Sequence, residues 1–212
     1  MDILDGLEIK VFDGAEQLDA WLSAHAGSER GIWLKIAKKG SGRTTVTVAE
    51  ALDVALCHGW IDGQRRRCDE TYFLQKYTPR RARSEWSKVN VRKVEALTRA
   101  GRMRPRGLAE VTAAKADGRW AAAYESQRSA TVPDDLAAAL ERDPPAKEAF
   151  ARLGRTGQYL VMLGLMKART PEVRAARLEK AIAELGGPPS QAGSPSPTSQ
   201  AAGPSPAPPP RT

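Results

Sequence analysis

Prolines divide the second half of the chain into segments of helix length. Each of four prolines stands before a run with apolar residues at helical spacing, and proline is favoured at the first position of a helix because its missing N–H costs nothing there. These residues are Pro105, Pro133, Pro144 and Pro171. A further helix is expected to begin near Thr156, so we predict that residues 84–186 are helical.

The first half of the chain mixes strand and helix patterns. The predicted strands are residues 9–12, 31–37, 60–67 and 71–77. Two helices are expected between the first three strands, because Asp13 with Glu16 and Thr47 with Glu50 each have the spacing of a capping box. Gly59 stands where the glycine that ends the second of these helices belongs.

These patterns place the chain in the α+β class. We expect a small mixed or antiparallel sheet in the N-terminal half, packed with a helical C-terminal half. Residues 187–212 hold nine prolines and no aliphatic side chain larger than alanine, so this Pro-rich tail is expected to be disordered. The prediction is therefore one domain over residues 1–186, with a strand and helix part at 1–80 and a helical part at 84–186.

Positive charge is concentrated in one part of the sequence. Residues 64–106 hold fourteen Lys or Arg against four Asp or Glu, a net charge of +10, whereas the whole chain carries +8. A charge so localised indicates a surface that meets an anion, although the sequence does not identify the anion.

Several classes of site and location are disfavoured by the sequence. No export signal and no apolar run long enough to span a bilayer are present, so we expect a cytoplasmic protein without membrane insertion. The histidines and cysteines, His25, His58, Cys57 and Cys68, lack the spacing of metal ligands. We therefore expect free thiols, no metal site and no cofactor.

The strand predicted at residues 60–67 carries the first group of candidate site residues. Side chains alternate along a strand, so Trp60, Asp62 and Gln64 are expected on one face and Arg65 on the other. In one interpretation, Asp62 and the flat ring of Trp60 line a polar niche. In the other, Trp60 is a core residue and Asp62 neutralises a nearby arginine. The sequence leaves both interpretations open.

A basic loop that leads into a helix carries the second group. Pro79 ends the preceding strand, and Ser87 has the position of a helix cap. A helix start presents free N–H donors and is therefore a potential anion site. Arg80 and Arg81 lie just before it and could hold a phosphate or carboxylate there, with Ser84, Ser87 and Asn90 as further donors. The alternative is a capping serine beside solvated arginines that pair with nearby carboxylates.

Three separated stretches of sequence resemble one known family. They are GWIDGQ at residues 59–64, LQKYTPRRARSEWSKVNVRKVEALTRAGRM at 74–103 and AKADGRW at 114–120. They are similar to the YdeI/OmpD-associated proteins, also called bacteriocin-protection proteins, and the similarity extends from about Leu7 to Leu185. The resemblance implies a link to the bacterial envelope and to tolerance of toxins or antimicrobial peptides, without a known reaction.

Three functions follow as hypotheses. The first is a soluble, non-enzymatic module that binds a small anionic ligand or an acidic protein partner. Its proposed ligand-binding residues are Trp60, Asp62, Gln64, Arg80, Arg81, Ser84, Trp86, Ser87 and Asn90. The second is nucleic-acid binding through the basic, aromatic segment 64–106. The third is an enzyme acting on a phosphorylated substrate with Asp62 as base, although no catalytic residue is assigned.

Overall fold

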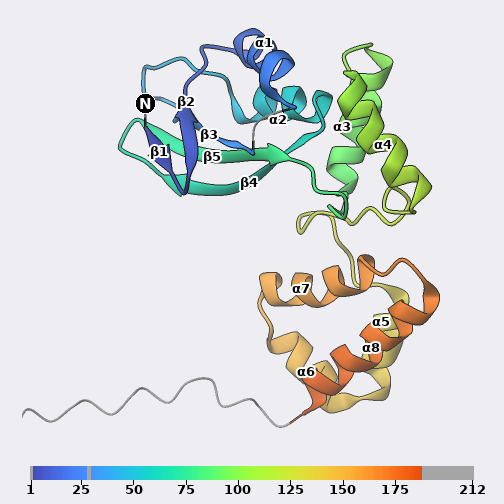
Figure 1. Ribbon diagram of the computed structural model, residues 1–212. Coiled ribbons are helices and arrows are strands. Elements are labelled where there is room, and N and C mark those ends of the chain that lie inside the picture. The colour runs from blue at the N-terminus through green and yellow to red at the C-terminus, as the bar shows by residue number, and fades with distance from the viewer. Residues whose placement is uncertain (1, 28–29, 188–212) are drawn as a thin grey trace, which may run out of the picture.

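A five-stranded sheet and eight helices make up the described part of the chain, as the computed structural model in Figure 1 shows. The structure describes residues 2–27 and 30–187, so the tail predicted to be disordered lies outside the described residues apart from Gly187. The strands are β1 (Ile3–Leu4), β2 (Leu7–Lys10), β3 (Ile32–Ala37), β4 (Trp60–Arg67) and β5 (Tyr72–Pro79). The helices are α1 (Ala15–His25), α2 (Val48–Cys57), α3 (Lys88–Arg99), α4 (Pro105–Ala116), α5 (Asp134–Arg142), α6 (Pro144–Arg152), α7 (Arg155–Met166) and α8 (Pro171–Gly186). The predicted α+β class is confirmed.

The sheet is mixed, with strand order β1-β2-β3-β5-β4. Only β2 and β3 pair in parallel, and the other neighbours are antiparallel. The strand predicted at residues 9–12 lies earlier, as β2, and β1 was not predicted. A strand as short as β1 shows no alternation of side chains in the sequence, which explains the omission.

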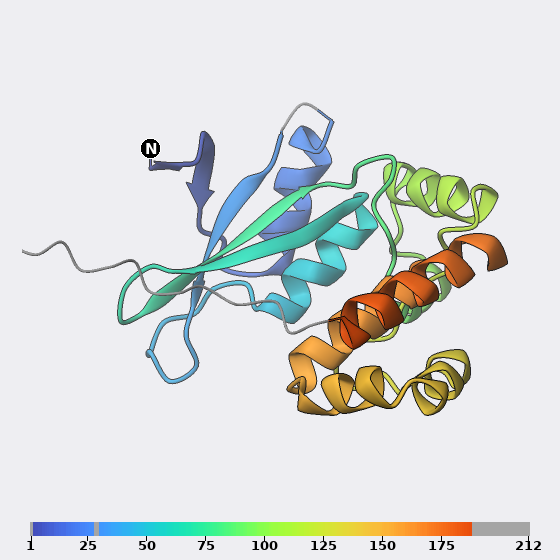
Figure 2. The same cartoon turned by 90° about the horizontal axis from the view of Figure 1, so that it is seen from below.

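Helices α1 and α2 cover one face of the sheet and leave the opposite face without helices (Figures 1 and 2). The first hydrophobic core lies between these layers. It includes Leu18 and Leu22 of α1, Ile32, Leu34 and Ile36 of β3, Ala51 and Val54 of α2, Trp60 of β4 and Tyr77 of β5. We refer to the uncovered side of the sheet as the open face.

The two predicted capping boxes had different outcomes. At α2 the box is confirmed, because Thr47 Oγ1 accepts the Glu50 N–H at 3.2 Å and Glu50 Oε2 accepts the Thr47 N–H at 2.9 Å. At α1 it was wrong. Gly14 is the N-cap without a side-chain bond, and Asp13 instead exchanges hydrogen bonds with Gln17, four residues away, across the first turn.

A second core joins α2 to α3 and α4. Its buried residues include Leu56 and Cys57 of α2, Trp86, Val94 and Leu97, and Val111 and Ala114 of α4. Helices α2 and α4 come into close contact at Gly107, where an added Cβ would lie 2.2 Å from the Cys57 carbonyl oxygen. Only glycine allows this spacing between the two helices.

Helices α5–α8 pack around a third core of their own, centred on Leu136, Phe150 and Leu165 (Figure 1). The N1 predictions are confirmed for Pro105, Pro144 and Pro171, whereas Pro133 is the N-cap of α5, one position earlier. Within the described residues, none of the helices combines the length and the apolar character that crossing a membrane requires.

Replacement of Gly107 by alanine should destabilise the protein, because α2 and α4 must separate to admit the methyl group. We expect a loss of about 1–3 kcal/mol in the free energy of unfolding, measured by urea denaturation. Gly164→Ala in α7 is the matched control, since an added Cβ meets nothing within 4 Å there. It should stabilise the protein by roughly 0.5–1 kcal/mol, and equal effects at both positions would contradict the close contact.

Candidate functional site

A β-bulge in β4 decides which candidate residues share a face of the sheet. The register changes between Asp62, which pairs with Tyr77, and Arg65, which pairs with Gln75. Arg65 therefore follows Asp62 on the helix-covered face, and its Nε donates to Gln75 Oε1 at 3.0 Å. The prediction that Gln64 shares a face with Asp62 and that Arg65 faces the other way was wrong, because a bulge adds one residue and reverses the alternation.

Trp60 is a core residue. Its side chain is fully buried, its Nε1 donates to the Ala26 carbonyl oxygen at 3.3 Å, and its ring meets the edge of Trp21 with centroids 6.3 Å apart. The indole is therefore surrounded by protein and forms no wall of an open site.

Arg80 and Trp86 form a buried stack after the end of β5. The Arg80 Cζ lies 3.6 Å from the centroid of the Trp86 ring, and the two residues are 6% and 2% exposed. Arg80 Nη1 donates to the Glu85 carbonyl oxygen at 3.2 Å, and no described carboxylate forms an ion pair with the guanidinium. Burial lowers the pKa of Arg80 to about 10, so this cation is held at an electrostatic cost.

Three buried side-chain atoms make no hydrogen bond within the described protein, and all three lie in this region. They are Tyr77 Oη, Arg80 Nε and Trp86 Nε1. Burial raises the pKa of Tyr77, and the nearby carboxylate of Asp62 raises it further. Burial also raises the pKa of Asp62, although a backbone hydrogen bond and the charges of Arg80 and Arg65 oppose the change. Perturbed ionisable groups and unpaired buried donors are more frequent at functional sites than elsewhere.

The loop between β5 and α3 is held in place by the segment that follows α4. Arg119 is 3% exposed, bonds the Asp117 carboxylate through Nε at 2.7 and 2.9 Å, and donates from Nη1 to the Ser84 carbonyl oxygen at 2.9 Å. The Trp120 ring packs on Trp86, with centroids 4.9 Å apart. Sequence reasoning did not identify Arg119, because its partner Ser84 is 35 residues away in the chain.

Two backbone N–H groups at the N-terminus of α3 are bonded within the protein. Ser87 caps the helix, as predicted, and its Oγ accepts the backbone N–H of Asn90 at 3.2 Å. The Lys88 N–H donates to the Tyr124 carbonyl oxygen at 2.8 Å. Ser84 Oγ accepts the Arg81 N–H at 3.1 Å, so its oxygen closes a turn. These backbone N–H groups and both serine oxygens, as acceptors, are therefore engaged within the protein.

A pocket lies on the open face of the sheet, and two of the residues predicted to bind a ligand line it. Gln64 and Arg81 line it with Arg30, Lys76 and Thr78, around a volume of about 370 Å³ that Asp5, Leu7 and Gly63 complete. Within residues 2–27 and 30–187, no carboxylate pairs with the three cations. Asp5 is bound instead to Arg66, with Nη2 and Oδ2 3.0 Å apart. We call this site the basic pocket.

The aromatic rings beside the basic pocket are covered by cations. Lys76 Nζ and Arg66 Cζ lie 5.6 and 5.3 Å from the centroid of Trp33, which is fully buried, and Lys35 Nζ lies 4.6 Å from that of Tyr72. These cation–π contacts occupy ring faces on which nucleic-acid bases would otherwise stack.

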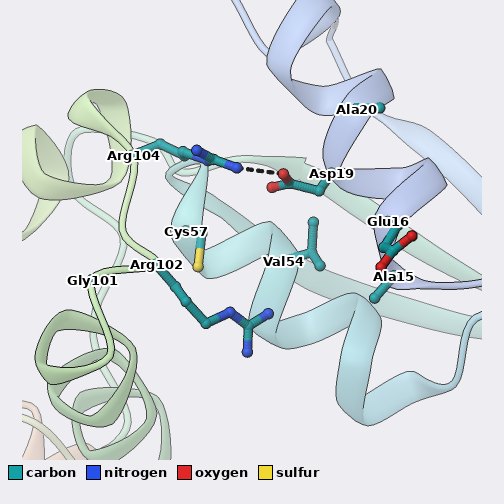
Figure 3. A pocket seen from close by; sticks show the side chains of 9 residues that line it. All are labelled: Ala15, Glu16, Asp19, Ala20, Val54, Cys57, Gly101, Arg102 and Arg104. Atoms are coloured by element: carbon teal, nitrogen blue, oxygen red, sulfur yellow. Dashed lines mark hydrogen bonds and ion pairs between the residues drawn. The ribbon is translucent and has the colours of Figure 1, made fainter.

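A second pocket lies between α1, α2 and the loop after α3 (Figure 3). At its edge Asp19 accepts a hydrogen bond from His58 Nε2 at 2.7 Å and pairs with Arg104 Nη2. Partial burial raises the pKa of Asp19, but these two partners outweigh it and the net pKa is lowered. Sequence reasoning missed this group because the partners of Asp19 are 39 and 85 residues away. We call this site the α1–α2 pocket.

Two sequence families match different parts of the chain. Residues 10–110 match the family described as Domain of unknown function (DUF8412), which covers most of the sheet with α1–α3 and the start of α4. Residues 129–186 match the family described as Bacteriocin-protection, YdeI or OmpD-Associated, which covers α5–α8. No curated protein and no solved structure matches the chain. The resemblance to the YdeI/OmpD-associated proteins is thus confirmed for residues 129–186. Its expected extent from about Leu7 is not, because residues 59–64 and 74–103, which first suggested it, lie in the part that matches the other family.

Asp62→Asn should stabilise the protein at neutral pH. A raised pKa means that the folded state binds a proton more tightly than the unfolded chain, so ionisation of Asp62 costs stability. The gain of the variant over the parent should appear as the pH rises above the ordinary pKa of 3.8 and vanish below it. Urea denaturation at several pH values measures the difference.

Asp19→Asn should have the opposite sign. The lowered pKa of Asp19 means that its ionised form stabilises the fold above the ordinary value of 3.8, and that this stabilisation is lost as the pH falls through the folded-state pKa. The variant should be less stable at neutral pH, and its deficit should shrink in acid. Differences of the same sign for both variants at neutral pH would contradict the two environments.

Proposed function

We propose that the chain is a non-enzymatic, anion-binding module whose sheet forms the ligand site, and whose residues 129–186 match the family described as Bacteriocin-protection, YdeI or OmpD-Associated. The ligand is a small phosphorylated or carboxylated molecule, and its site is the basic pocket. The description of the family makes tolerance of bacteriocins, or of related antimicrobial stress, the cellular role that we propose for this binding.

The observation that carries the proposal is the set of unpaired cations around the basic pocket. Arg30, Lys76 and Arg81 face it without a partner among the described carboxylates, while Asp5 is engaged by Arg66. A guanidinium holds a phosphate or carboxylate with two parallel hydrogen bonds, and a lysine adds a point charge. A volume of about 370 Å³ suits a small ligand, since ligand sites typically measure roughly 300–1,000 Å³.

Polar groups without charge complete the pocket. The Thr78 hydroxyl and the Gln64 amide can each donate one more hydrogen bond to an anion. The backbone of the bulge is fixed by Gln75, whose Nε2 donates to the Gly63 carbonyl oxygen at 2.8 Å. This bond holds the backbone next to Gln64. An anion bound here meets donors from β4, from β5, from Arg81 in the loop after β5 and from Arg30, which precedes β3.

Nucleic-acid binding is the second candidate, favoured by the continuation of positive charge along the open face to Lys35 and Arg66. It ranks below a small anion because the Trp33 and Tyr72 rings are already covered by cations. A nucleic acid would then bind mainly through its phosphates, with a steep dependence on salt concentration.

Replacement of both Arg30 and Arg81 by glutamine should weaken the binding of inorganic pyrophosphate by roughly tenfold or more, because two charge-assisted contacts are lost. Both side chains are exposed and make no ion pair with a described residue, so stability should stay within about 0.5 kcal/mol of the parent. Isothermal titration calorimetry at low ionic strength measures the affinity.

The double variant Arg43→Gln, Arg99→Gln serves as the matched control, since both are exposed arginines without a described ion pair and lie outside the lining of the basic pocket. It changes the net charge without touching the site and should leave the affinity unchanged. Equal weakening by the control would attribute binding to net charge alone. Binding of a single-stranded oligonucleotide far more tightly than pyrophosphate would favour the nucleic-acid alternative.

A further inference from the structure

The α1–α2 pocket presents opposite charges from different elements of the fold (Figure 3). Helix α1 contributes Glu16, and the loop after α3 contributes Arg102, around a volume of about 400 Å³. The remaining lining residues are Ala15, Asp19, Ala20, Val54, Cys57, Gly101 and Arg104. This pocket lies apart from the basic pocket, because α1 and α2 occupy the covered face of the sheet.

Two of the four charged residues in the lining are already neutralised. Asp19 is engaged by Arg104 and by His58, which is 4% exposed. Glu16 and Arg102 remain, and no described residue forms an ion pair or a side-chain hydrogen bond with either. Both are exposed, so a ligand from solvent can reach them.

The pocket is held in shape by the same contacts that neutralise Asp19. The Asp19 carboxylate ties α1 to the end of α2 through His58 and to the loop after α3 through Arg104. The backbone N–H of Arg102 also donates to the Leu97 carbonyl oxygen at 3.0 Å, which fixes the start of that loop on α3. A pocket whose walls are held before binding loses less freedom when a ligand arrives.

Part of the lining of the pocket is small and apolar, and Val54 lies between Glu16 and Arg102 (Figure 3). Ala20 and Val54 contribute methyl groups, and Cys57 contributes a thiol whose pKa is raised by burial. The thiol is therefore neutral at physiological pH and behaves as an apolar group. Small side chains leave room here for an aliphatic part of a ligand.

We propose that the α1–α2 pocket binds a small zwitterion of the amino-acid or short-peptide class. The ligand carboxylate pairs with Arg102, its ammonium group pairs with Glu16, and an aliphatic side chain lies against Ala20 and Val54. A ligand with charge of one sign would be attracted by one unpaired group and repelled by the other. Opposite charges at the two ends of one small molecule satisfy both groups.

The probe for this site is L-alanyl-L-alanine, titrated calorimetrically into the full chain. Its N-acetyl derivative lacks the ammonium charge, and its C-terminal amide lacks the carboxylate. We expect the dipeptide to bind and each derivative to bind roughly tenfold more weakly or worse, as expected for the loss of one charge-assisted contact. Absence of binding by the dipeptide, or equal affinity for all three compounds, would overturn the proposal.

Two substitutions assign each end of the dipeptide to its partner. In Arg102→Gln the preference for the dipeptide over its amide should disappear, and in Glu16→Gln the preference over the N-acetyl derivative should disappear. Arg99→Gln and Glu95→Gln, at exposed positions of α3 outside the pocket, are the matched controls and should keep both preferences. Retention of both preferences in the pocket variants would reject the assigned contacts, and thermal denaturation verifies that every variant is folded.

Ala20→Phe tests the pocket without altering a charge. Ala20 is an exposed residue of α1 that lines the pocket, so a larger side chain is tolerated by the fold but takes up space at the pocket's edge. Dipeptide binding should fall at least tenfold, while pyrophosphate binding at the basic pocket should be unchanged. Unaltered dipeptide affinity in this variant would place the ligand elsewhere.

Discussion

The stack of the Arg80 guanidinium on the Trp86 indole is the contact on which the arrangement of sheet and helices depends. Arg80 directly follows β5 and its backbone N–H donates to the Gly59 carbonyl oxygen at 2.9 Å, so it is anchored where β4 and β5 end. Trp86 belongs to the second core, with α3 and α4. A buried cation without a carboxylate partner costs free energy, which here is offset by cation–π attraction and by the bond to the Glu85 carbonyl.

The same loop also connects to the helices of the third core. Lys167, which follows α7, pairs with the Glu85 carboxylate at 2.7 Å, and Tyr159 of α7 donates its hydroxyl to the Glu125 carbonyl oxygen at 2.9 Å. Residues near the Arg80–Trp86 stack thus contact parts of the chain that match two different families. The loop after β5, which the sequence predicted to bind a ligand, therefore also joins these parts of the chain through Glu85.

The basic pocket and the α1–α2 pocket differ in which of their charged side chains lack a described partner. On the open face, Arg30, Lys76 and Arg81 have no described acidic partner, and the basic pocket suits an anion. Between α1, α2 and the loop after α3, the pairing of Asp19 leaves Glu16 and Arg102 without described partners, which suits a ligand with both charges. The high net charge of the chain does not distinguish these cases, because it counts charges without regard to their partners.

The sequence by itself determined the features that depend on neighbours within a few residues. The capping of α2 by Thr47 and of α3 by Ser87, and the helix starts at three of the four prolines, are local, so their spacing predicted them. Contacts between distant residues could not be predicted in this way. Asp19 meets His58 and Arg104 only because α1 packs beside α2.

Only the tertiary structure decided where the candidate side chains point. A single additional residue in β4 moved Gln64 to the open face beside Arg81 and left Asp62 beside Tyr77. The alternation of a strand is a local rule, whereas a bulge results from the pairing of two strands. The sequence therefore predicted the α+β fold and a concentration of positive charge, and the packing of strands and helices decided which charges remain free to bind a ligand.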